Sequence, residues 1–313
     1  MHPAYSVILF TTASGAGYGL LVWLGFGRLL RLLPLTATFT CAAFGLALAL
    51  ITAGLCSSLA HLGRPERAWR ALSQWRSSWL SREGVMALAT YVPAGLLALS
   101  SLWFDGVGPL TEALALLTVA AALLTLFTTG MIYASLRTIR QWHQPLTVPV
   151  LIALGLASGA VLNNLVLALL TGTPRWAAWA AIVSLAAAGI LKWAYWRTID
   201  GELRSHTVEA ATGLGRFGKV RPLEPPHTEP NYIMREMGYR VARKHVTTLR
   251  QLVGVLAVAV PLALSLLSLL PALALMAAAL AAASMAVGVV IERWLFFAEA
   301  EHVVMLYYGA DVA

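Results

Sequence analysis

The sequence contains little charge. Only 12% of its 313 residues are Asp, Glu, Lys or Arg, 59% are hydrophobic, and the mean hydropathy is +0.75. A soluble globular domain has about 25% charged residues. The scarcity of charge therefore excludes an ordinary soluble protein and indicates an integral membrane protein.

Cysteine is almost absent as well. The two cysteines, Cys41 and Cys56, fall in one predicted helix, where about 1.5 Å of rise per residue places them roughly 22 Å apart. This distance excludes a disulfide between them, and we interpret both as buried thiols without a redox role. Their number and spacing fit neither zinc nor a cysteine-ligated iron–sulfur cluster, so we expect this chain to bind no metal itself.

Eight long apolar runs dominate the rest of the chain. A membrane helix needs about 20 consecutive apolar residues, whereas the strands of a membrane barrel are shorter and alternate. The predicted spans are 6–27, 35–59, 85–104, 110–133, 148–171, 176–196, 251–270 and 272–291. Pro271 separates the last two as a hairpin. We predict a single all-α membrane domain, a bundle of eight transmembrane helices. The first span lacks the basic segment that begins a cleavable signal peptide, so we expect it to be retained.

Basic residues gather on one side of these spans. Eight spans place both termini on one side, together with the second, fourth and sixth loops. This side has 18 Lys and Arg residues, whereas the other has only Arg28, Arg31 and Arg175; Lys192 lies inside the sixth span. Because Lys and Arg accumulate in cytoplasmic loops, we predict that both termini are cytoplasmic.

The longest segment between spans is 197–250. It has ten basic and six acidic residues, and its prolines and glycines are mixed with aromatic and aliphatic side chains. This composition is too hydrophobic for a simple tether, and loops of this length are usually functional or disordered. We predict that it docks a peripheral subunit; the alternative is a disordered cytoplasmic loop.

A few polar or small residues interrupt the spans. Gly15 and Gly19 are four residues apart, a spacing that favours close helix packing. Asn163 and Asn164 lie midway through the fifth span, where we expect at least one interhelical hydrogen bond.

Charged residues of the spans are expected near the membrane surface. Lys192 can extend its amine toward the interface, and we expect Glu292 and Arg293 at the cytoplasmic end of the eighth span. On this interpretation the spans contain no paired intramembrane charges.

The segment between the second and third spans contains the candidate site. His61 follows the second span, and Glu83, 22 residues later, precedes the third. Antiparallel neighbouring helices would bring both to one membrane depth. A histidine with an ordinary pKa of about 6.5 can exchange a proton with a quinone oxygen, and a carboxylate at the membrane edge can pass protons to water. The pair therefore indicates a quinone site; the alternative is that both only stabilise helix ends.

Three neighbours join the candidate site by proximity alone. Arg64 or Arg82 could polarise the second quinone oxygen or hold Glu83 ionised. Tyr91 lies farther along the third span. We expect all three near the bound quinone.

The residues around this site resemble those of a known family. HLGRPERAW at 61–69, followed by SREG at 81–84, resembles the signature of the dimethyl sulfoxide reductase anchor subunit family. The chain termini, MHPAYSVILFTTASGAGYGL and ERWLFFAEAEHVVMLYYG, are most similar to the branch that anchors membrane-bound sulfite dehydrogenase. The resemblance covers essentially the whole chain, and it implies that His61 and Glu83 form the family's quinone site.

The resemblance also implies partners and a location. Family members are eight-span subunits of bacterial inner-membrane complexes, with a molybdenum catalytic subunit and a four-cluster iron–sulfur subunit. Anchors of exported reductases place the histidine and glutamate on the outer face, whereas the charge bias here places them inside. The resemblance implies that electrons from sulfite oxidation pass through cytoplasmic iron–sulfur clusters to the quinone, and that this chain performs only the quinone reduction step.

The sequence is also compatible with three other functions. The same pocket could oxidise quinol in the anchor of a sulfoxide or polysulfide reductase. A haem b cytochrome subunit would use histidines near helix ends, such as His61, His143 and His245. A secondary transporter ranks last, because it would show repeats, broken spans and paired intramembrane charges.

Overall fold

The computed structural model describes residues 3–60, 62–103, 107–172, 174–202, 206–224, 226–238 and 245–311. Within these ranges eight helices are long and apolar enough to cross a membrane, which confirms the predicted all-α bundle. In chain order they are α1 (Tyr5–Leu29), α2 (Ala37–Leu59), α3 (Trp79–Trp103), α4 (Pro109–Ala134), α5 (Thr147–Leu170), α6 (Arg175–Gly201), the seventh span (Val246–Leu267) and the eighth (Pro271–Ala298), most of which is α12 (Ala274–Ala298).

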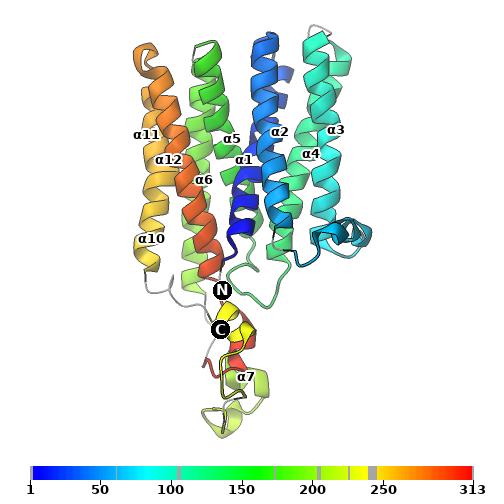
Figure 1. Ribbon diagram of the computed structural model, residues 1–313. Coiled ribbons are helices and arrows are strands. Elements are labelled where there is room, and N and C mark those ends of the chain that lie inside the picture. The colour runs from blue at the N-terminus through cyan, green and yellow to red at the C-terminus, as the bar shows by residue number, and fades with distance from the viewer. Residues whose placement is uncertain are drawn as a thin grey trace.

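The eight helices stand side by side. Both termini, the segment between α2 and α3, and the short helix α7 (Val208–Thr212) lie at the same end of the bundle, which we call the terminal face (Figure 1). Helix α1 is central, because it packs on α2, α4, α5 and α12. It therefore joins a first half, made of α2, α3 and α4, to a second half, made of α5, α6 and the last two spans (Figure 1).

Glycines set the close crossing of α1 and α5. A Cβ added to Gly19 would lie 1.9 Å from the carbonyl oxygen of Gly155, and one added to Gly159 would lie 2.1 Å from the carbonyl carbon of Gly19. Any larger residue at these positions would push the two backbones apart. The predicted packing role is thus confirmed for Gly19, whereas a Cβ on Gly15 would meet no atom within 4 Å.

The seventh span is continuous but irregular. It consists of α10 (Val246–Val253), a π-helical turn (Gly254–Ala259) and α11 (Val260–Leu267). Pro261, the second residue of α11, lies just after the π turn and has no N–H to donate to that turn, which accounts for the change in winding. The predicted hairpin is present: α11 ends at Leu267, and the short helix η4 (Pro271–Leu273) begins the eighth span.

Four helices are longer than predicted at the terminal face, among them α10, which begins at Val246 rather than at 251. Helix α3 begins at Trp79 rather than at 85, α6 ends at Gly201 rather than at 196, and α12 ends at Ala298 rather than at 291. The extra turns contain polar residues, which a search for apolar runs does not count. As a result, charged side chains expected at helix ends lie inside helices.

The predictions for the polar residues and the cysteines of the spans are only partly confirmed. Asn164 donates a hydrogen bond from Nδ2 to Ser268 Oγ at 3.1 Å, so the predicted interhelical bond is present. Cys41 and Cys56 are separate free thiols, as expected, but both are exposed on the outside of the bundle. The prediction that they are buried is wrong, because they lie on the face of α2 that no other described helix covers.

Candidate functional site

Glu83 lies in the second turn of α3, close to the terminal face. Its side chain is only 4% exposed. The 3₁₀ segment η1 (Pro65–Gln74) packs against this turn: the Ser81 hydroxyl bonds to the Ala71 carbonyl, and a Cβ on Gly84 would lie 2.9 Å from Leu72 Cδ2. The sequence placed Glu83 before the helix; the structure places it inside the helix, beneath η1.

Neutral hydroxyl groups surround the Glu83 carboxylate. The Thr129 hydroxyl, on α4, lies within hydrogen-bonding reach of it, and the carboxylate acts electrostatically on the hydroxyl of Tyr18, on α1. Among the described residues, Glu83 Oε1 and the Tyr18 hydroxyl are both buried without a hydrogen-bond partner. Two buried polar atoms in this state are expected to bind a ligand or water. Sequence reasoning missed Tyr18 and Thr129, because hydroxyl residues in apolar runs follow no recognisable spacing.

A second charged cluster lies inside the second half of the bundle. Glu292 Oε1 is 2.5 Å from Lys192 Nζ, and Glu292 Oε2 is 2.5 Å from Arg293 Nε. All three side chains are buried: Glu292 is 0% exposed, Lys192 4% and Arg293 3%. The expectation that Lys192 reaches the interface, that Glu292 and Arg293 lie there, and that the spans lack paired charges is therefore wrong. Helix α12 continues past Arg293, so both residues stay within the bundle.

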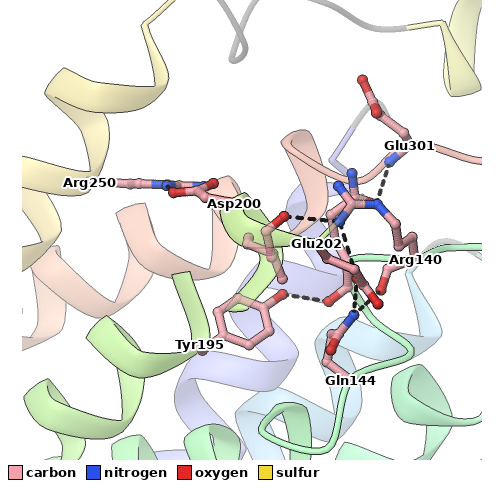
Figure 2. A network of polar contacts seen from close by, with 9 residues as sticks. Arg140, Gln144, Tyr195, Asp200, Glu202, Arg250 and Glu301 are labelled. Carbon is pink, nitrogen blue, oxygen red and sulfur yellow. Dashed lines mark hydrogen bonds and ion pairs between the residues drawn. The ribbon is translucent and has the colours of Figure 1, made fainter. Parts of the chain in front are cut away.

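A polar network covers the second half at the terminal face (Figure 2). Arg140 Nη1 is 3.2 Å from Glu202 Oε2, which also accepts a hydrogen bond from Gln144 at 2.6 Å. Arg250 is 2.6 Å from Asp200 and 2.8 Å from Glu299. These groups tie the ends of α6 and α10 to the loop after α4.

An open pocket of about 190 Å³ lies within this network. Its lining includes Arg140, Asp200, Arg250, Glu299 and Glu301. Burial raises the pKa of the Glu299 carboxyl above its ordinary value, and the nearby Arg250 guanidinium opposes the shift. The pocket therefore borders a largely buried acid at the terminal face, which is able to exchange protons with water in the pocket closer to neutral pH than a free glutamate.

Comparison with known proteins identifies the chain's relatives. Residues 1–309 match the model of the family described as DMSO reductase anchor subunit (DmsC). The chain is 36% identical to the C subunit of sulfite dehydrogenase from Allochromatium vinosum, over 335 aligned positions that cover 98% of this chain and 99% of that protein. The chain belongs to the DMSO reductase anchor subunit family. The predicted resemblance is confirmed.

The predicted site residues of this anchor subunit are only partly brought together. His61 lies outside the described residues, so its pairing with Glu83 stays a prediction. Arg64 is exposed. Arg82 donates hydrogen bonds to the Trp75 and Arg76 carbonyl oxygens at 2.9 and 2.7 Å. Arg82 therefore holds the segment before α3 in place.

Tyr91 has a partner on the neighbouring helix. Its hydroxyl is 2.7 Å from Thr52 Oγ1, on α2. The contact bridges α2 and α3, two helices that otherwise pack mainly on α1 and α4 respectively. In this anchor subunit Tyr91 thus lies two turns away from Glu83 along α3. The carboxylate is within hydrogen-bonding reach of Thr129 and acts electrostatically on the hydroxyls of Tyr18 and Tyr133.

Proposed function

We propose that this chain is the membrane anchor and quinone-reactive subunit of a molybdenum and iron–sulfur oxidoreductase complex. The observation that carries the proposal is Glu83, a buried carboxylate near the membrane surface. One of its oxygens is unpartnered among the described residues, and the carboxylate acts electrostatically on the Tyr18 hydroxyl, which is buried and unpartnered among them as well. Membership of the anchor family supports it. The likeness to the C subunit of sulfite dehydrogenase favours sulfite as the source of the electrons.

A bound quinone takes up two electrons and two protons and leaves as quinol. Glu83 would give one proton to a quinone oxygen, and His61 would give the other or hold that oxygen by a hydrogen bond. The Tyr18 hydroxyl is placed to hydrogen-bond the carboxylate or the ligand. Electrons would arrive from iron–sulfur clusters of a partner subunit at the terminal face, and both acids would then recover their protons from the same side.

The charge bias supports a cytoplasmic terminal face, because 18 Lys and Arg residues lie on that side of the spans and 3 on the other. The catalytic and iron–sulfur subunits would then be cytoplasmic, and the chain would lie in the inner membrane of a bacterium. An anchor that oxidises quinol for a sulfoxide or polysulfide reductase would use the same carboxylate in the reverse direction.

The test begins with the complex that copurifies with the tagged chain from native membranes in mild detergent. We expect molybdenum and iron in stoichiometric amounts, and sulfite oxidation coupled to a short-tailed quinone. In Glu83→Gln and His61→Ala complexes, quinone-coupled turnover should fall at least about a hundredfold, since each removes an acid–base group, while sulfite oxidation with an artificial dye as acceptor should be unchanged. Normal quinone coupling in both variants would refute the site, and quinol-driven sulfoxide reduction without sulfite oxidation would reverse the direction.

The segment after α6 is proposed as the docking surface for the iron–sulfur subunit. It contains α7, the turn η2 (Gly215–Phe217) and α8 (Tyr232–Met237), and it is tied to the C-terminal segment by a hydrogen bond from Asn231 to the Tyr308 hydroxyl at 3.0 Å. Large apolar side chains stay exposed there outside the membrane spans: Phe217 is 73% exposed and Leu223 fully exposed. Exposed apolar groups of this kind usually mark an interaction surface.

A charge placed on this surface tests the docking proposal. Phe217→Asp and Leu223→Asp together should abolish copurification of iron with the chain, because a carboxylate cannot be buried unpaired in an interface without a large cost. The chain itself should remain in the membrane in normal amount. Full iron content in the double variant would place the docking surface elsewhere.

A further inference from the structure

The buried cluster of Lys192, Glu292 and Arg293 carries one net positive charge. Burial of an unbalanced charge is costly, and the three members differ in how they can relieve it. Arg293 cannot lose its proton, and Glu292 is clamped between two cations at 2.5 Å each. Only the Lys192 amine can release a proton and leave a neutral Glu292–Arg293 pair behind. Lys192 is therefore suited to gain and lose protons inside the bundle.

A small cavity, lined by apolar side chains and by several hydroxyl groups, lies between this cluster and the neighbourhood of Glu83. Its volume is about 20 Å³, enough for a water molecule. Arg293 lines it from α12, and Thr12 and Tyr18 line it from α1 with hydroxyls that are buried and unpartnered among the described residues. Thr129, the hydroxyl beside Glu83, lines it from α4. Polar groups thus follow one another from Arg293 to Glu83 across the junction between the two halves.

On its other side the cluster faces the pocket at the terminal face. Lys192 Nζ lies 4.5 Å from the centre of the Tyr195 ring and 5.0 Å from that of Trp196. The Trp196 ring also lies 5.4 Å from the Arg250 guanidinium carbon, and the Glu299 carboxylate acts electrostatically on the Lys192 amine. Glu299 itself lines the open pocket. The cluster therefore lies between a largely buried acid that lines an open pocket and a cavity near Glu83.

We propose that Lys192, Glu292 and Arg293 relay protons from the pocket at Glu299, through the cavity, to Glu83. The proposal rests on the proposed function, because Glu83 would need a proton after each transfer to quinone. In one cycle Glu299 gives a proton to the neutral Lys192 amine, the ammonium passes one on by way of the Glu292 carboxylate and cavity water, and Glu83 accepts it. Glu299 recovers its proton from solvent. No electron moves, and each group ends in its initial state.

The competing route is direct exchange of Glu83 with solvent at its own end of α3. The two routes differ in their need for Lys192, which belongs to α6 in the other half of the bundle. Lys192→Met is the informative variant, because it leaves the Glu292–Arg293 pair neutral and paired. Lys192→Arg keeps the positive charge but cannot release a proton.

The experiment uses the purified complex with a short-tailed quinone. If the relay operates, Lys192→Met and Lys192→Arg both lower quinone-coupled turnover at least about tenfold and raise its solvent deuterium isotope effect, while dye-coupled sulfite oxidation stays normal. The control variant is Arg175→Met, which removes an exposed cation at the opposite end of α6. It should change neither the quinone-coupled turnover nor its solvent isotope effect. If the complex that contains Lys192→Met does not assemble, the Lys192→Arg complex alone tests the relay.

Three outcomes would overturn the relay. Normal turnover and isotope effect in both Lys192 variants, with Glu83→Gln inactive, would show that Glu83 has its own access to solvent and would leave the proposed function intact. Recovery of turnover in Lys192→Arg, with loss only in Lys192→Met, would reduce Lys192 to a buried charge with a structural role. Full quinone activity in Glu83→Gln would remove the relay's acceptor, and the proposed function with it.

Discussion

Glu83 and Glu292 are both buried carboxylates inside the bundle, but their surroundings differ. Glu83, in the first half, is next to the neutral hydroxyls of Tyr18 and Thr129, and its Oε1 has no hydrogen-bond partner among the described residues. Glu292, in the second half, is held by two cations at 2.5 Å each. One carboxylate is thus left available for a ligand or a proton, whereas the other is held in ion pairs on both oxygens.

The difference separates two reasons for burying a charge in a membrane protein. Paired charges such as Glu292 contribute mainly through the cost of breaking them, because removing one partner leaves the other unpaired in a low dielectric. Glu83 has no cation partner among the described residues and contributes little to stability through ion pairing, so its burial near the membrane surface points to chemistry. The same substitution should therefore mainly reduce stability at Glu292 and mainly reduce quinone-coupled turnover at Glu83.

The largest predicted effect is on stability and concerns Glu292→Gln. The change leaves Lys192 and Arg293 buried beside a neutral amide, so the free energy of unfolding should fall by about 3–5 kcal/mol. Glu83→Gln should lower it by no more than about 1 kcal/mol, because the amide can still bond to the Thr129 hydroxyl. Unfolding of the purified chain in detergent micelles, titrated with a denaturing detergent, measures both.

A double variant checks the cause of that loss. Combining Glu292→Gln with Lys192→Met removes one of the two unpaired cations, so the double variant should be more stable than Glu292→Gln alone. Equal losses for Glu83→Gln and Glu292→Gln would mean that Glu83 also has a cation partner, and the contrast between the two sites would disappear.

Much of the fold could be predicted from the sequence. Eight apolar runs of sufficient length account for the eight spans, and Pro271 for the last hairpin. The errors lie at helix ends, where α3, α6 and α12 extend into polar sequence that tertiary contacts stabilise. The outward position of Cys41 was also missed, because an almost uniformly apolar helix such as α2 gives no periodic signal for which face is covered.

The candidate site was predictable only in part. Glu83 stood out as a charge beside a span, but the side chains around it come from α1 and α4 and carry no sequence signal. Lys192 and Glu292 lie far apart in the chain, and only the packing of α6 near α12 shows that they pair. One signal was available: charged residues within apolar runs usually find each other, so Lys192 and the Glu292–Arg293 pair could have been matched.

The smallest predicted effect distinguishes two tyrosines near Glu83. The Tyr18 hydroxyl is buried, lies within electrostatic reach of the carboxylate and has no partner among the described residues, whereas the Tyr91 hydroxyl bonds to Thr52 at 2.7 Å. Tyr18→Phe should lower quinone-coupled kcat about tenfold, equivalent to about 1.4 kcal/mol, because it removes the hydroxyl that would hydrogen-bond the bound quinone or the carboxylate during turnover. Tyr91→Phe should change kcat and the KM for quinone by less than about threefold, because it removes only a contact between α2 and α3.

Steady-state assays of the complex measure kcat and KM for both variants, with dye-coupled turnover as the internal control. A larger effect of Tyr91→Phe would mean that quinone enters between α2 and α3 and displaces Thr52 from the Tyr91 hydroxyl, which would move the reactive end of the site two turns along α3.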